Sequence, residues 1–162
     1  MRARLLRLRT AWLSETAARI IVESAKCAHP HETGGVLVGV LVHSSPWITS
    51  VVEVPPGSPQ ASTYHMSSEA RPRAVAQERV KDPRVGYLGD WHSHPADVGA
   101  SATDAAALMS LARSRGAHSP HPLLIVARRR GDGYELEAQH VDDDCLAPTR
   151  LIAAGSLPAE QR

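Results

Sequence analysis

The sequence predicts a single domain of the mixed α/β (α+β) class, in which helices pack on a mainly antiparallel sheet. The chain has 162 residues, a length that suits one domain with one sizeable core. Hydrophobic residues make up 43% of it, as in an average globular protein, which argues against disorder. Apolar runs typical of strands alternate along the chain with segments of helical periodicity, which indicates a layered fold of both element types.

The first half of the chain predicts a strand, a helix and two further strands, at residues 5–9, 14–29, 34–42 and 47–54. Ser14 is a candidate N-cap for the helix. The apolar face of this helix is formed by Ala17, Ile20, Ile21, Ser24 and Cys27. The two strands that follow are rich in β-branched residues, and the turn at 43–46 is short enough to join them as a hairpin.

The second half predicts a helix, a strand, a helix and a hairpin, at residues 69–82, 84–94, 101–116 and 121–142. Pro55–Ser62 has the composition of a loop. Pro72 is tolerated in the first turn of its helix, and Gly131–Gly133 is the turn of the hairpin. No regular pattern follows Asp144, so we expect a domain at 1–145 and a C-terminal tail at 146–162.

Composition and charge exclude several classes of function. The formal net charge is +1, which gives no overall field that would attract nucleic acid or a membrane surface. The local run Arg128–Arg130 has no aromatic platform beside it and is interpreted as a solvated strand end. Two cysteines are too few for a disulfide framework, and no apolar run is long enough to span a bilayer. We therefore expect a cytoplasmic protein without nucleic-acid or membrane partners.

The stretch around His92 and His94 carries the clearest chemical signal. On a strand these two residues share one face, and two imidazoles at this spacing can converge on a zinc ion. Asp104, at the start of the next helix, can fold back as a third ligand and leave a fourth position for water. The alternatives are that the histidines are ordinary polar residues at a strand end, and that Ser101 and Asp104 only cap the helix.

Two further acidic residues are candidates for roles beside that site. Glu32 directly precedes a buried strand whose glycines allow a close approach of the backbone, and metal-assisted hydrolysis needs a general base of this kind. Asp90 shares the strand face of His92 and His94 but lies one step too far back to reach the same ion. We expect it to orient a histidine ring instead.

Taken together, Glu32, His92-Ser93-His94-Pro95 and Ser101-x-x-Asp104 resemble the JAMM (MPN-plus, JAB-type) zinc metalloprotease family, prokaryotic branch. The resemblance covers roughly Leu5 to Val141 and implies a single-domain MPN/JAMM fold, related to cytidine deaminase, with a curved sheet flanked by helices. It implies Zn²⁺ held by His92, His94 and Asp104. It further implies Glu32 as general base and Ser101 as hydrogen-bond donor to the oxyanion. One departure is the spacing of six residues between His94 and Ser101, where many members have seven.

The resemblance also implies a substrate. Family members cleave isopeptide or peptide bonds after the Gly-ended tail of ubiquitin or a ubiquitin-like protein, in conjugates or in precursors. A ubiquitin-activating-type enzyme is then expected in the same pathway, and the tail is expected to bind as a strand added to a sheet edge.

Three other interpretations compete with this one. The same fold also serves as a non-catalytic protein-interaction module. A zinc deaminase would need a C-x-x-C pair, which this chain lacks. A rival metal cluster at Cys27, His29 and His31 has loose spacing at a helix end, and Cys27 is better interpreted as a core residue on the buried helix face.

Overall fold

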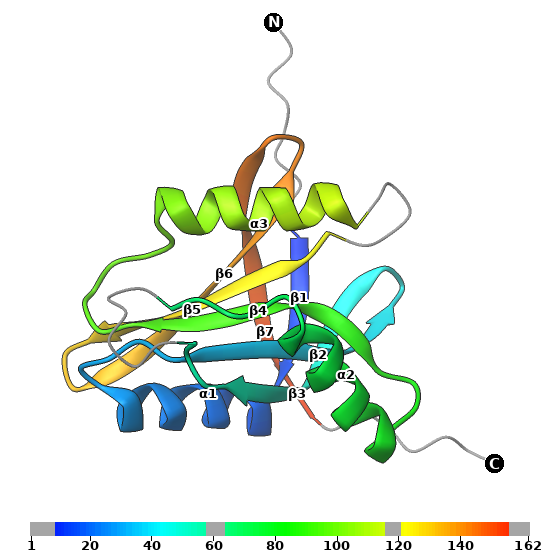
Figure 1. The fold of residues 1–162 in the computed structure, drawn as a ribbon, viewed down its shortest axis with the longest axis horizontal. Helices are drawn as coiled ribbons and strands as arrows, with labels where there is room; N and C mark the ends of the chain where they lie inside the picture. Colours follow the sequence, from blue (N-terminus) through cyan, green and yellow to red (C-terminus); the bar gives the residue numbers. More distant parts are fainter. Residues whose placement is uncertain (1–8, 58–63, 116–120, 156–162) are drawn as a thin grey trace, which may run out of the picture.

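Helices and strands follow one another along the chain in nearly the predicted order. The computed structural model describes residues 9–57, 64–115 and 121–155 (Figure 1). Its elements are β1 (Arg9–Ser14), α1 (Glu15–Ala28), β2 (Gly34–Val42), β3 (Ser45–Val54), α2 (Ala70–Lys81), β4 (Gly86–His94), α3 (Ala102–Ser114), β5 (Leu123–Arg130), β6 (Gly133–Asp142) and β7 (Cys145–Ala154). The predicted strand at 5–9 and the loop at 55–62 lie largely outside the described residues, as does the predicted end of the last helix at Gly116.

Helix α1 begins where the sequence places its N-cap. The Ser14 side chain accepts a hydrogen bond from the backbone N–H of Ala17 at 3.1 Å, which satisfies one of the free donors of the first turn. The buried positions of the helix are Ala17, Ile21, Ser24 and Ala25. Cys27 is exposed, so its expected place in the core is wrong. Ala25, one turn beyond Ile21, occupies the buried face instead.

Tight turns join the antiparallel strands. His43 and Ser44 both have positive φ values, 49° and 66°, and connect β2 to β3 as a two-residue hairpin turn whose twist matches the strands. The predicted hairpin of β5 and β6 is confirmed, with Arg130 paired to Gly133 across its turn. Helix α3 is the crossover between β4 and β5, which pair in parallel.

The sheet closes on itself into a barrel, which the expected curved sheet flanked by helices did not include. The strand order is β1-β3-β2-β4-β5-β6-β7, and β1 pairs in parallel with both β3 and β7 to complete the barrel. The interfaces of β2 with β3 and β4, and of β6 with β5 and β7, are antiparallel. The remaining three are parallel, so the sheet is mixed, as predicted. The β1–β3 pairing is short and involves only Trp12 and Leu13 of β1. Helix α1 packs against both β3 and β6.

The expectation of an irregular segment after Asp144 is wrong for residues 145–154. They form β7, which pairs antiparallel with β6 and parallel with β1. Propensity gave no signal because Pro148 and alternating small residues weaken the strand pattern. The sheet therefore continues past residue 145, and the limits 1–145 and 146–162 remain a prediction.

The helices lie on two sides of the sheet (Figure 1). Helix α1 packs on one face, around the fully buried Trp91 of β4 and Leu37 of β2. On the other face α2 covers β2 through Ala74, and α3 covers β5 through Leu108 and Ala112. Side chains of β4 that point away from Trp91 thus emerge between α2 and α3.

None of the helices in the described segments is long and apolar enough to cross a membrane. The basic run at the end of β5 is paired with acidic neighbours. Arg128 lies 3.0 Å from Glu137, and Arg130 lies 2.6 Å from Glu135. These ion pairs support its interpretation as a charged strand end.

Candidate metal centre

The end of β4 presents two buried histidines toward the gap between α2 and α3. His92 and His94 alternate with Trp91 and Ser93, which point to the opposite face. Two hydrogen bonds join Ser93, at this end of β4, to Thr33. The Ser93 N–H donates to the Thr33 carbonyl at 2.8 Å, and the Ser93 Oγ accepts the Thr33 N–H at 3.0 Å. The segment before β2 is therefore held beside the two histidines.

Asp104 reaches the histidines from the first turn of α3. Ser101 is the N-cap, and its Oγ accepts the Asp104 N–H at 3.1 Å while Asp104 Oδ2 accepts the Ser101 N–H at 2.6 Å. This reciprocal capping box orients the carboxylate toward β4. The capping role that the sequence offered as an alternative to a metal role is real, and the same geometry brings Asp104 to the histidines.

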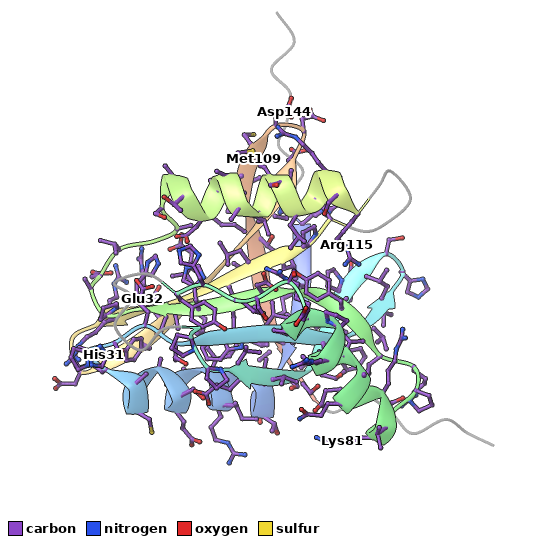
Figure 2. The ribbon with its side chains drawn as sticks, viewed as in Figure 1. His31, Glu32, Lys81, Met109, Arg115 and Asp144 are labelled. Atoms are coloured by element: carbon purple, nitrogen blue, oxygen red, sulfur yellow. The ribbon has the colours of Figure 1, made fainter. Side chains whose placement is uncertain are left out.

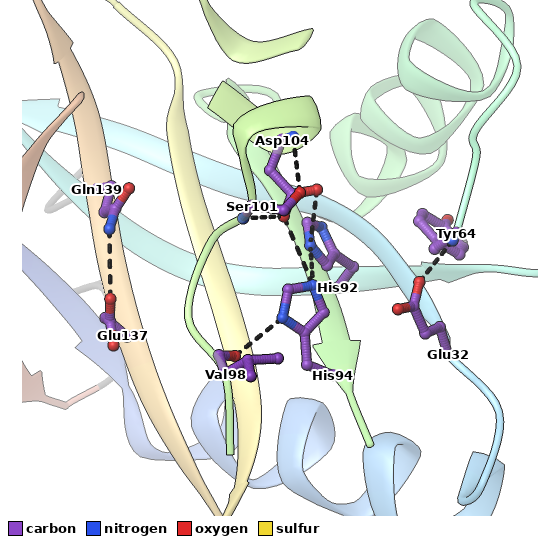
Figure 3. Close-up of polar contacts among 9 residues, drawn as sticks. All are labelled: Glu32, Tyr64, His92, His94, Val98, Ser101, Asp104, Glu137 and Gln139. Atoms are coloured by element: carbon purple, nitrogen blue, oxygen red, sulfur yellow. Dashed lines mark hydrogen bonds and ion pairs between the residues drawn. The ribbon is translucent and has the colours of Figure 1, made fainter. Parts of the chain in front are cut away.

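Three donor atoms converge at this point (Figure 3). The Nε2 atoms of His92 and His94 lie 3.1 Å apart, and they lie 3.3 and 3.5 Å from the two Asp104 carboxylate oxygens. Donors bound at about 2.05 Å to one tetrahedral zinc ion lie about 3.3 Å from each other. The donor set therefore fits a single zinc ion, and it is the only group of three metal-capable side chains found among the described residues.

The hydrogen bond at the outer nitrogen of His94 leaves the converging nitrogen of that ring available. His94 Nδ1 lies 2.9 Å from the Val98 carbonyl, an acceptor, so Nδ1 carries the proton and Nε2 carries the lone pair. Burial opposes ionisation of Asp104. The hydrogen bonds from His92 and from the Ser101 N–H prevail, and the pKa of Asp104 falls well below its ordinary value. An ionised carboxylate and a neutral imidazole are the forms that bind zinc.

Glu32 lies beside this cluster without belonging to it. Gly34, two residues later, pairs with His92 across the β2–β4 interface. The Glu32 Oε2 atom accepts the backbone N–H of Tyr64 at 2.6 Å (Figure 3). Figure 2 shows Glu32 below the N-terminal end of α3, with Arg115 at the opposite end of that helix. The carboxylate is thus placed near the site by backbone contacts from β4 and from the segment before α2.

The adjacent glycines serve a different purpose from the expected approach of a ligand. A Cβ atom on Gly34 would lie 2.6 Å from the Tyr64 ring and 2.5 Å from the Trp91 carbonyl. A Cβ atom on Gly35 would collide with the Val52 carbonyl of β3. The glycines are required by neighbouring protein groups, not by open space for a substrate.

Asp90 does not orient a histidine ring, and that expectation is wrong. Its carboxylate accepts two hydrogen bonds at 3.1 Å from Arg71 Nε and one at 2.6 Å from Arg71 Nη2. The Tyr87 hydroxyl donates to it at 2.8 Å. Asp90 therefore ties β4 to α2 through Arg71. No local pattern predicts this pair, because its partners are 19 residues apart.

The rival cluster is not assembled. Cys27 is exposed, and His29 Nδ1 contacts the Tyr134 hydroxyl at 3.3 Å. His31 is exposed as well, and these residues form no metal-capable group within the part of the chain that the structure describes.

A pocket of about 200 Å³ opens next to the three donors. Its polar wall contains His92, Asp104, Asp90 and Arg71. Its apolar wall is formed by α3 and by the segment before α2, through Ala107, Leu108, Leu111 and Met66. Tyr64, which no sequence pattern singled out, lines this pocket and stacks on His92 with ring centroids 6.4 Å apart. An isolated tyrosine after a loop carries no local signal of such a contact.

Comparisons with known proteins agree with this geometry. The family model described as prokaryotic homologs of the JAB domain matches residues 14–141. A curated protein of Sinorhizobium fredii named "Probable metalloprotease y4qB" is 28% identical over 122 residues, which cover 71% of this chain and 73% of that protein. The solution structure of protein DSY2949 from Desulfitobacterium hafniense superposes with a TM-score of 0.68 at 20% identity, covering 91% of this chain and 95% of that one. The last comparison supports the fold alone.

Proposed function

Because this chain belongs to the family of prokaryotic homologs of the JAB domain, we propose that it is a zinc metalloprotease that hydrolyses isopeptide or peptide bonds. The observation that carries the proposal is the convergence of His92, His94 and Asp104 at distances that suit one tetrahedral ion. The relative named as a metalloprotease supports the same assignment.

Different residues of the chain bind the ion and transfer the proton. His92, His94 and Asp104 would hold the ion, which when bound supplies Lewis acidity toward water and the scissile carbonyl. Glu32 takes a proton from the attacking water and returns it to the leaving nitrogen. Its Oε2 already accepts the Tyr64 N–H, so we assign the proton to Oε1.

Ser101 is assigned to the developing oxyanion. Its Oγ accepts the Asp104 N–H, so its own O–H proton remains available to donate toward the cluster. A donor aimed at the place where negative charge develops stabilises the transition state more than the substrate. With these five side chains in place, the enzyme is favoured over the non-catalytic interaction module.

The proposed substrate is the Gly-ended tail of a ubiquitin-like protein, with a ubiquitin-activating-type enzyme in the same pathway. Support comes from the resemblance of the motif. Strand β4 is paired on both sides, by β2 and β5, so a tail could not add to it as a further strand. We place the tail across the pocket between α3 and the segment before α2.

The test uses a Gly-Gly-ended ubiquitin-like protein fused to a reporter domain, with an Ala-Ala fusion as matched substrate. We expect one zinc ion per chain and cleavage after Gly-Gly. Glu32→Gln should retain its zinc and lose turnover by about 10²–10⁴-fold, the range typical of the loss of a general base. Protein that takes up no zinc overturns the metalloprotease assignment. Equal cleavage of the Gly-Gly and Ala-Ala fusions overturns only the proposed substrate preference.

A further inference from the structure

Tyr64 contacts both halves of the candidate site with different atoms. Its backbone N–H donates to Glu32 Oε2 at 2.6 Å. Its ring stacks on His92, with centroids 6.4 Å apart and an angle of 23° between the ring planes. Its hydroxyl donates to the Val54 carbonyl at the end of β3 at 2.8 Å. One residue therefore links the candidate base, a candidate ligand and the barrel wall.

The barrel is shaped to receive this ring. A Cβ atom on Gly34 would lie 2.6 Å from Tyr64 Cε1, so the ring occupies the space that the glycine leaves open. Gly34 is also the residue that pairs with His92. The ring is thus held between the start of β2 and the His92 imidazole, and its position depends on both.

The hydroxyl anchors the ring to the barrel wall, because it donates to the Val54 carbonyl at the end of β3. The ring and the hydroxyl of Tyr64 together fix its backbone. They therefore also fix the backbone N–H that donates to Glu32.

We propose that Tyr64 is a positioning residue that holds the Glu32 carboxylate in place for proton transfer, an inference that rests on the proposed function. A glutamate side chain has several freely rotating bonds, and ordering it for proton transfer has an entropic cost. A donor fixed in the folded protein removes this cost from the chemical step. Tyr64 lines the pocket but supplies no group to the reacting atoms, so it acts through Glu32.

The kinetic test compares variants that separate ring, hydroxyl and fold. Tyr64→Ala keeps the N–H but releases its backbone, and we expect kcat to fall roughly 10²-fold, the effect of a small misplacement of a catalytic group, with KM changed less than about threefold. Zinc content should stay at the wild-type value. Tyr64→Phe keeps the ring and should retain most of the turnover. Tyr64→Leu serves as a second variant if the alanine form does not fold.

Tyr134→Ala is the matched control, because Tyr134 is another partly buried tyrosine that packs against the core cluster around α1 and is not among the residues that line the pocket. It should lower the melting temperature and leave kcat unchanged. If Tyr64→Ala and Tyr64→Leu keep wild-type kcat, or lose no more than Tyr134→Ala, Tyr64 does not position the base.

A second readout needs no substrate and no metal. In metal-free protein, hydrogen exchange at the Tyr64 amide should quicken at least about tenfold in Glu32→Ala, because the charge-assisted bond is lost. Glu32→Gln, whose amide oxygen can still accept, should keep most of the protection. Unchanged exchange in Glu32→Ala would contradict the contact itself, and this outcome is independent of whether the proposed substrate is correct.

Discussion

Asp90 and Asp104 approach the end of β4 from different elements, and their carboxylates have different partners. Asp104 faces the two histidine nitrogens, at 3.3 and 3.5 Å. Asp90 is engaged by Arg71 and Tyr87. The same side-chain type therefore belongs to the candidate metal centre at one position and to the packing of α2 at the other.

Substitution by alanine should separate these roles. Asp104→Ala removes one of three ligands and should lose most of the bound zinc after dialysis, together with turnover. Asp90→Ala should keep its zinc but lower the free energy of unfolding by roughly 2–3 kcal/mol, because it leaves Arg71 without its bidentate partner. Metal analysis and urea unfolding of both variants check this. Zinc loss in Asp90→Ala with retention in Asp104→Ala would reverse the ligand assignment.

The individual ligands could be predicted from the sequence, whereas most of their supporting partners could not. Two histidines on one strand face and an aspartate in the first turn of a helix follow from local periodicity. The contacts of Glu32 with Tyr64 and of Ser93 with Thr33 span 32 and 60 residues of chain. Such pairs depend on which segments the fold brings together.

At the scale of the element, the N-terminus of α3 combines a helix cap with the candidate oxyanion donor. Ser101 accepts the Asp104 N–H through Oγ, and in return Asp104 accepts the Ser101 N–H. The shortened loop of six residues between His94 and Ser101 is compatible with this capping box. The Val98 carbonyl within the loop also accepts a hydrogen bond from His94 Nδ1. The loop thus positions both a ligand and the cap.

Two substitutions at Ser101 distinguish capping from catalysis. Ser101→Ala should cost about 1 kcal/mol of stability, whereas Ser101→Gly should cost only a few tenths, roughly as at other N-caps. Both lose the hydroxyl, so both should lower kcat by about 10²–10³-fold if it donates to the oxyanion. Thermal unfolding and steady-state kinetics measure the two effects. If kcat falls only in proportion to the loss of stability, so that Ser101→Gly has a kcat near that of the wild type, Ser101 has the capping role alone.

At the scale of the whole molecule, β7 closes the barrel. It pairs with β6 from Ala138 to Asp142 and with β1 along the whole of that strand. Ala147 and Thr149 of β7 are buried, and Thr149 Oγ1 meets the buried His140 at 2.8 Å. Removing the strand would open two edges and expose part of the core.

Deletion of residues 145–162 should therefore abolish cooperative unfolding and promote aggregation, because β1 and β6 lose their common neighbour. Deletion of 156–162 alone leaves β7 in place and is the control. Circular dichroism melting curves and the yield of monomer on gel filtration provide the measurements. A 1–144 chain that melts cooperatively near the full-length temperature would show that closure of the barrel is dispensable.

The sequence by itself determined the elements from α1 to β6 and the three candidate ligands, because periods of two and 3.6 residues and short spacings are local properties. Only the tertiary structure decided that the sheet closes, that Asp90 pairs with Arg71 and that Tyr64 meets Glu32 and His92. These features arise from contacts between segments far apart in the chain, which form only when the strands take their order in the barrel. They have no signature in any single stretch of sequence.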